Sequence, residues 1–193
     1  EAMKARIDEA KELGQSLGGT FRVVVNGLLP ALGGFEEARN RLTSKLGGAL
    51  FSIPAIKGVE FGIGFKNAEV FGHEAHDEIY LDKKKGFMRR TNRAGGLEGG
   101  MTTGMPLIMT AAMKPIPTQI DPLNTVNIDT LEVDKASTER SDVCAVPAAS
   151  VVAEAEVAFV IAQAYLDKFG SDNMTDIKAN IESFKKRIKT MSR

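Results

Sequence analysis

Residues 147–169 read PAASVVAEAEVAFVIAQAYLDKF, a run in which alanine, valine and other apolar residues dominate. Gly170 follows it, as is common after the last turn of a helix. The run has no continuous polar face, and a helix that is apolar around most of its circumference is usually buried. This stretch therefore predicts a long helix that is buried on several faces.

The segments before and after this helix predict an irregular mixture of strands and helices. Strands are expected at residues 20–25, 79–81, 87–91, 107–113 and 126–133, with strand and turn over 51–65. Helices are expected at residues 1–14, 35–46 and 175–191, and a glycine-rich loop at 93–104. The strict strand–helix alternation of a doubly wound sheet is absent, so we expect an α+β fold with antiparallel strands.

The composition of the 193 residues excludes several classes of protein. Hydrophobic residues make up 43% and charged residues 26%, which disfavours disorder. The 25 Lys and Arg balance 25 Asp and Glu, so the excess positive charge of a nucleic-acid or anionic-membrane binder is missing. Cys144 is the single cysteine, which suits a reducing compartment. No run of 18 apolar residues and no signal segment is evident, so we expect a cytoplasmic protein.

The chain begins inside a predicted helix. Met3, Ile7 and Ala10 share one face, yet no capping residue and no initiator methionine precede them. We interpret the chain as the later part of a longer protein.

Two further patterns favour structural roles. Residues 73–78, HEAHDE, hold both histidines, but not in the HExxH spacing of a zinc helix. We expect a solvated turn whose polar side chains bond to backbone, without a metal. Methionine recurs every four residues from 101 to 113, where Gly104 and Pro106 disfavour a helix. On a strand, the odd-numbered residues 105–113 share one face, so core packing is expected.

Three other segments are candidates for chemistry. Residues 89–104, RRTNRAGGLEGGMTTG, place three arginines before five glycines, which suits either an anion site or a flexible surface loop. Residues 114–118, KPIPT, hold a lysine and a hydroxyl in a stiff segment, which suits either a phosphate or a strand-end connection. In residues 140–144, RSDVC, Arg140 and Asp142 form either a surface pair or a ligand-binding guanidinium beside a proton-transferring carboxylate.

Taken together, these segments resemble the chorismate synthase family. Residues 91–100 (TNRAGGLEGG) are similar to its glycine-rich motif and residues 114–118 to its KPIPT segment. Residues 140–144 with 152–155 are similar to its C-terminal signature, and residues 52–55 with 57–62 to another characteristic stretch. The resemblance covers the whole chain, residues 1–193, as the C-terminal half of a single domain whose N-terminal half is absent.

The resemblance implies a fold, an activity and partners. The fold is a β-α-β sandwich of helices packed with antiparallel sheets, in a cytoplasmic homotetramer that binds neither nucleic acid nor membrane. The activity is that of a lyase in the shikimate pathway of aromatic amino acid biosynthesis. It forms chorismate from 5-enolpyruvylshikimate 3-phosphate by 1,4-anti elimination of phosphate. Reduced FMN is required, and NADPH only where the enzyme reduces its own flavin.

The resemblance also assigns site residues. The implied FMN contacts are Pro54, Ala55, Gly99, Lys114, Pro115, Ile116, Pro117, Thr118 and Arg140. Asp142 would assist proton movement at the flavin N5. Many relatives carry asparagine at position 54, and proline there keeps a backbone contact while losing the amide.

The family's two catalytic histidines lie in the N-terminal half. His73 and His76 do not take their roles, and we expect this chain alone to be inactive. The alternative is a noncatalytic module that binds a phosphate ligand or oligomerises.

Overall fold

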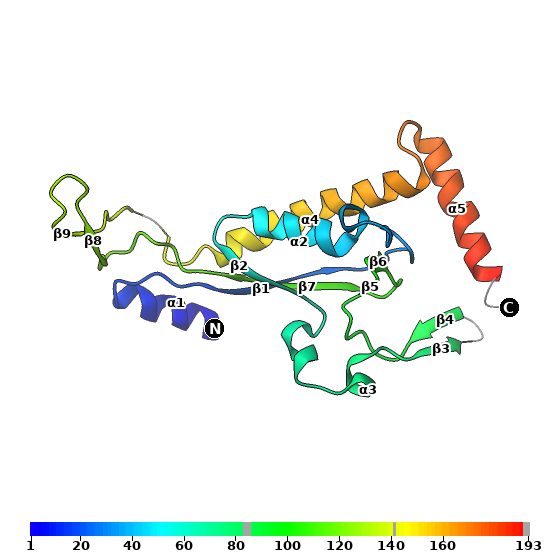
Figure 1. The fold of residues 1–193 in the computed structure, drawn as a ribbon, viewed down its shortest axis with the longest axis horizontal. Coiled ribbons are helices and arrows are strands. Elements are labelled where there is room, and N and C mark those ends of the chain that lie inside the picture. The colour runs from blue at the N-terminus through cyan, green and yellow to red at the C-terminus, as the bar shows by residue number, and fades with distance from the viewer. Residues whose placement is uncertain (83–85, 141, 191–193) are drawn as a thin grey trace.

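The computed structural model describes residues 1–82, 86–140 and 142–190, and is centred on a three-stranded antiparallel sheet (Figure 1). Strand β7 (Leu107–Met113) lies in the middle, between β1 (Gly19–Val25) and β2 (Ile56–Phe61). Met109 of β7 is opposite Val23 on one side and Phe61 on the other. The expected α+β fold with antiparallel strands is confirmed.

Helices α2 (Leu42–Ser52) and α4 (Val146–Phe169) form a layer over one face of this sheet (Figure 1). Apolar residues four apart turn one side of each helix inward. The buried residues of this core include Leu42, Leu46, Leu50, Leu107, Met109, Ala111, Ala149, Ala153 and Val157. Burial of a leucine of this kind contributes about 1.5–3 kcal/mol to folding. The shared buried face predicted for the methionine strand is confirmed at residues 107, 109 and 111.

The outer face of α4 is not covered by this chain. Phe159 is 75% exposed and Val151 is 67% exposed. The expectation of burial on several faces is therefore wrong for the described residues, because only the side of α4 that faces the sheet and α2 is packed against other segments. Among the described residues, α4 is also the one helix long and apolar enough to cross a membrane, a property that core helices share and that is weak evidence for a membrane segment.

The remaining elements lie around this layer. They are helices α1 (Ala2–Glu12), α3 (Gly72–Ala75) and α5 (Met174–Thr190), the 3₁₀ helices η1 (Ala38–Asn40) and η2 (Gly64–Ala68), and the hairpins β3 (Ile79–Asp82) with β4 (Gly86–Arg89), β5 (Leu97–Glu98) with β6 (Met101–Thr102), and β8 (Asn124–Val126) with β9 (Val133–Lys135). Helix α5 packs on the end of α4, where the rings of Phe169 and Phe184 meet edge to face with 5.5 Å between their centroids.

Two predicted elements differ from the structure. The predicted helix 35–46 is a turn followed by α2, because the Glu36 carboxylate accepts hydrogen bonds from the Phe35 N–H and the Asn40 side chain and so closes a local turn. The predicted strand 126–133 is wrong, because only Val126, at the end of β8, and Val133, at the start of β9, lie in strands. The residues between them form the hairpin turn, where Asn127 Oδ1 accepts the Asp129 N–H. The predicted glycine-rich loop contains the short hairpin β5–β6, and the basic residues 83–85 lie outside the described residues.

Candidate functional site

Segments far apart in the sequence meet at the C-terminal end of β7. The Lys114 N–H donates to the Ala55 carbonyl at 2.9 Å, which joins the KPIPT segment to the turn between α2 and β2. Ala55 has φ +68°, a left-handed conformation that residues other than glycine rarely adopt. Such strain is frequent at functional sites, because only a rigid surrounding structure maintains it.

The connection between α1 and β1 holds two of the candidate segments side by side. The Ser16 hydroxyl donates to the Ile116 carbonyl at 2.5 Å, and the Leu17 N–H donates to the Val143 carbonyl at 2.7 Å. Gly18 is required here because a Cβ would collide with the Met113 carbonyl. Sequence reasoning missed residues 16–18, since a serine and a glycine before a strand have no distinctive signature.

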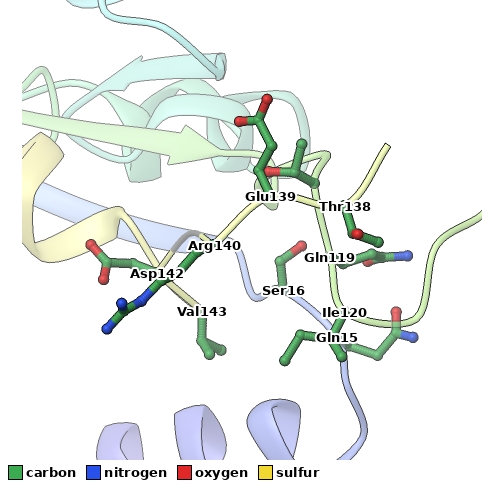
Figure 2. Close-up of a pocket in the computed structure, with 10 residues that line it drawn as sticks. Gln15, Ser16, Gln119, Ile120, Thr138, Glu139, Arg140, Asp142 and Val143 are labelled. Carbon is green, nitrogen blue, oxygen red and sulfur yellow. The ribbon is translucent and has the colours of Figure 1, made fainter. Parts of the chain in front are cut away.

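A cavity of about 380 Å³ opens where these segments meet (Figure 2). Small-molecule sites usually occupy about 300–1,000 Å³. Figure 2 shows the side chains of Arg140 and Asp142 projecting to the same side of their loop. The cavity is lined by Gln15, Ser16, Thr118, Gln119, Ile120, Thr138, Glu139, Arg140, Asp142 and Val143. Ser141, between the arginine and the aspartate, lies outside the described residues.

The structure therefore brings together most of the predicted site residues. Pro54 and Ala55, residues 114–118, Arg140 and Asp142 all lie at this end of β7. Lys114 and Arg140 are exposed cations, and Ile116 is half-buried. The cavity itself offers the guanidinium of Arg140 and the carboxylates of Glu139 and Asp142, and Lys114 adds an exposed positive charge at the same end of β7. Arginine and lysine suit an anionic group of a ligand.

Gly99 is the exception among the predicted site residues. It lies in the turn between β5 and β6, and the carbonyl of the adjacent Gly100 accepts the Leu42 N–H at 2.8 Å, at the first residue of α2. Ala55 lies beyond the other end of that helix. The structure thus separates Gly99 from the remaining predicted residues.

The glycine-rich loop is fixed by close packing. A Cβ on Gly95 would collide with the backbone of Gly62, and a Cβ on Gly62 would collide with the Arg93 carbonyl. The Ile108 N–H donates to the Gly95 carbonyl at 2.9 Å, which attaches the loop to the start of β7. The loop is therefore part of the packed framework.

Asp77 anchors this loop from the side of α3. Its carboxylate accepts the Thr91 hydroxyl at 2.5 Å, the Arg93 N–H at 2.7 Å and the Ala94 N–H at 2.9 Å. The turn predicted at residues 73–78 does bond to backbone, but Asp77 is buried rather than solvated, because the loop closes over it. Burial raises the pKa of Asp77, yet the hydrogen bonds and the nearby charge of Arg89 outweigh it and hold that pKa below its usual value.

The lowered pKa of Asp77 predicts a pH dependence of stability. The Asp77 carboxyl holds its proton less tightly in the folded state than in the unfolded state, so its ionised form stabilises the fold at neutral pH. This stabilisation is lost as pH falls below the unfolded-state pKa of about 3.9 towards the lower folded-state pKa. We expect Asp77→Asn to lower the free energy of unfolding by about 2–4 kcal/mol at pH 7, since hydrogen bonds to a charged group are worth about 1.5–3 kcal/mol each.

Urea unfolding between pH 7 and pH 2.5 measures this effect, with Asp172→Asn, on the exposed turn after α4, as the matched control. The difference in the free energy of unfolding between Asp77→Asn and the native protein should become smaller as the pH is lowered. A difference that is constant over this pH range would contradict the lowered pKa of Asp77.

Both histidines lie at a second cavity, of about 510 Å³, together with Arg90 and Arg93. Within residues 1–82, 86–140 and 142–190, no group of three His, Cys, Asp or Glu side chains is placed to hold a metal ion. The His73 carbonyl accepts a hydrogen bond from the Arg93 guanidinium at 3.4 Å.

The fold and the first cavity define an α+β protein with a candidate ligand site, lined by Arg140 and Asp142, near the end of a central strand. A sequence profile of the chorismate synthase family matches residues 1–166. Chorismate synthases of Bacillus velezensis and Bacillus subtilis are 55% and 54% identical to the chain over 184 residues, which is 95% of the chain and 47% of each relative. A crystal structure of chorismate synthase superimposes with a TM-score of 0.82 and 41% identity, covering 98% of this chain and 49% of that one.

The chain therefore belongs to the chorismate synthase family. It spans about half the length of the curated relatives that it matches.

Proposed function

We propose that residues 1–193 are the C-terminal half of a chorismate synthase. This half and the N-terminal half together make up the full-length protein. The full-length protein is a lyase that eliminates phosphate from 5-enolpyruvylshikimate 3-phosphate to form chorismate. The observation that carries this proposal is that Thr118, the last residue of the KPIPT segment, lines one cavity with Arg140 and Asp142, although more than 20 residues separate it from the other two.

The residues in and beside this cavity fit FMN. The ammonium of Lys114 and the guanidinium of Arg140 suit its phosphate, and arginine can bind phosphate with two parallel hydrogen bonds. Pro115 and Pro117 fix the backbone on which Thr118 presents its hydroxyl. Pro54 and Ala55 complete the edge of the site through the hydrogen bond from Lys114 to the Ala55 carbonyl.

Each group then has a role in the elimination. The chemistry that reduced FMN supplies when bound is transient electron donation while the phosphate leaves, with no net redox change. Asp142 holds or moves a proton at the flavin N5, and the polar cavity wall orients the anionic substrate. NADPH enters only where the enzyme reduces its own flavin.

The assembly proposed is a cytoplasmic homotetramer in which the N-terminal half covers the outer face of α4. The exposure of Val151 and Phe159 supports this arrangement, because contiguous exposed apolar surface on a helix usually marks an interface. The catalytic histidines belong to that other half.

Substitution of the two cations tests the FMN site. We expect Lys114→Ala and Arg140→Ala in the full-length protein each to weaken FMN binding by about tenfold or more, because a hydrogen bond to a charged group is worth about 1.5–3 kcal/mol. A flavin-fluorescence titration measures the dissociation constants. Lys178→Ala is the matched control, since it removes an exposed charge from α5. Unchanged affinity in both test variants would overturn the assignment.

A further inference from the structure

Residues 14–18, in the connection between α1 and β1, lie along one wall of the candidate cavity, and we call them the strap. The Gly14 carbonyl accepts the Asp121 N–H at 3.0 Å. The Ser16 hydroxyl donates to the Ile116 carbonyl at 2.5 Å. The strap therefore contacts the chain that follows β7 at two points.

The strap also contacts the segment that leads into α4. The Leu17 N–H donates to the Val143 carbonyl at 2.7 Å. Figure 2 shows Ser16 between the stretch that holds Gln119 and the stretch that holds Arg140. Because Ser16 and Leu17 are neighbours, one short piece of chain sets the separation of two segments that are more than 20 residues apart in the sequence.

The KPIPT segment cannot be held by a strand ladder. Its two prolines have no N–H, so the segment cannot continue the pairing that ends with β7. The Lys114 N–H donates to the Ala55 carbonyl and fixes the start of the segment. The bond from Ser16 then fixes Ile116, which lies between the two prolines. A side-chain donor from the strap thus does what a neighbouring strand does elsewhere in the sheet.

The hydroxyl of Ser16 is occupied by this main-chain contact. A serine hydroxyl has one proton, and Ser16 donates it to the Ile116 carbonyl. That proton is therefore not available to an anionic group in the cavity. Ser16 and Ile116 are both half-buried, so removal of the hydroxyl leaves the Ile116 carbonyl without this donor where water reaches it less freely.

Gly18 brings the strap close to the end of β7. A Cβ at Gly18 would collide with the Met113 carbonyl and with the ring of Pro115. Glycine is the residue that permits such an approach of two backbones. The close packing at Gly18 and the hydrogen bond from Ser16 therefore both fit the strap to the KPIPT segment.

We propose that Ser16 is a positioning residue for ligand binding at the candidate cavity. Through its bond to Ile116, it keeps the KPIPT segment at the distance from Arg140 at which one phosphate-bearing ligand contacts both. This role rests on the proposed flavin site. Without the hydroxyl, the segment is displaced in part of the molecules, and only the positioned fraction binds. Ser16 therefore sets how much of the free protein is competent to bind, while the contacts of the bound ligand stay the same.

Ser16→Ala in the full-length protein tests this role. Stopped-flow flavin fluorescence measures the association and dissociation rate constants of FMN separately. We expect the association rate constant to fall by about three- to tenfold, the population shift that one hydrogen bond of this kind produces. The dissociation rate constant should stay within about twofold of the native value, because the bound state keeps its contacts.

Two further variants provide the comparison. Ser150→Ala is the matched control, since the Ser150 hydroxyl also donates to a carbonyl, that of Pro147 at 2.7 Å, but within α4. It should leave both rate constants unchanged. Lys114→Ala removes a proposed direct contact with the flavin, so it should raise the dissociation rate constant. The contrast with Ser16→Ala separates positioning from contact.

The outcomes that overturn the role are distinct. If Ser16→Ala keeps native affinity while Lys114→Ala and Arg140→Ala lose it, the KPIPT segment is positioned without this bond. If Ser16→Ala weakens binding through faster dissociation, Ser16 contacts the flavin directly and is not a positioning residue. If Lys114→Ala and Arg140→Ala both keep native affinity, the proposed flavin site itself is wrong and the role of Ser16 falls with it.

Discussion

We expect Asp142→Asn in the full-length protein to lower turnover by about 10²–10⁴-fold, the usual cost of removing a positioned acid–base group. Asparagine keeps the shape of the side chain but cannot accept a proton. Asp142 lines the cavity beside Arg140, and both are exposed, so the substitution leaves no buried group without a partner. Fold, oligomeric state and most of the FMN affinity should therefore be retained, and Asp142→Ala should behave in the same way.

Steady-state kinetics at saturating reduced FMN measure this loss of turnover. Asp172→Asn is the matched control, since Asp172 is exposed and does not line the cavity. A role limited to holding Arg140 in place would appear as weaker FMN binding with near-native turnover at saturation. That result would remove Asp142 from the catalytic assignment.

The second large effect concerns the chain by itself. We expect residues 1–193, supplied with reduced FMN and 5-enolpyruvylshikimate 3-phosphate, to form no measurable chorismate. The groups proposed to protonate the leaving phosphate and the flavin belong to the other half. The outer face of α4, with Phe159 75% exposed, is also the surface that the N-terminal half is proposed to cover.

Chorismate formation followed by absorbance measures this, first with the chain alone and then with the N-terminal half added in trans. Addition should restore part of the turnover. The control is the same addition to a chain carrying Asp142→Asn, which should restore little. Turnover by residues 1–193 alone would show that the catalytic groups are misplaced.

The elements with strong local patterns could be predicted from the sequence. The apolar run 107–113 is β7 with the same bounds, and residues 147–169 lie within α4. In β7 the buried residues 107, 109 and 111 alternate as on a strand, and in α4 the long apolar run that ends before Gly170 marks the helix itself. The exposed outer face of α4 could not be predicted, because exposure depends on which other segments are present to cover it.

The remaining elements depend on contacts that no sequence window contains. The Glu36 carboxylate closes a turn where the first part of the helix 35–46 was expected, and α2 begins only at Leu42. Asn127 stabilises a hairpin turn where the strand 126–133 was expected. The burial of Asp77 depends on backbone N–H groups at Arg93 and Ala94, which lie 16 and 17 residues further along the chain. Side-chain to backbone bonds of this kind override propensity.

The candidate site was predictable only in part. Of the motif residues, Thr118, Arg140 and Asp142 line one cavity in the structure, whereas their roles stay predictions. The bonds from Ser16 and Leu17 that hold these segments together could not be predicted, and neither could the placement of Gly99 at the far end of α2. Motifs specify residue types, whereas the distance between them is set by the fold.

The proposed function is tested most directly by asking whether the full-length protein eliminates phosphate from 5-enolpyruvylshikimate 3-phosphate. Chorismate and inorganic phosphate should be measured in parallel, anaerobically, with reduced FMN, with oxidised FMN and without flavin. We expect equal amounts of both products with reduced FMN and none in the other two reactions. Failure to form chorismate with reduced FMN, in protein that is folded and binds the flavin, would contradict the proposed function.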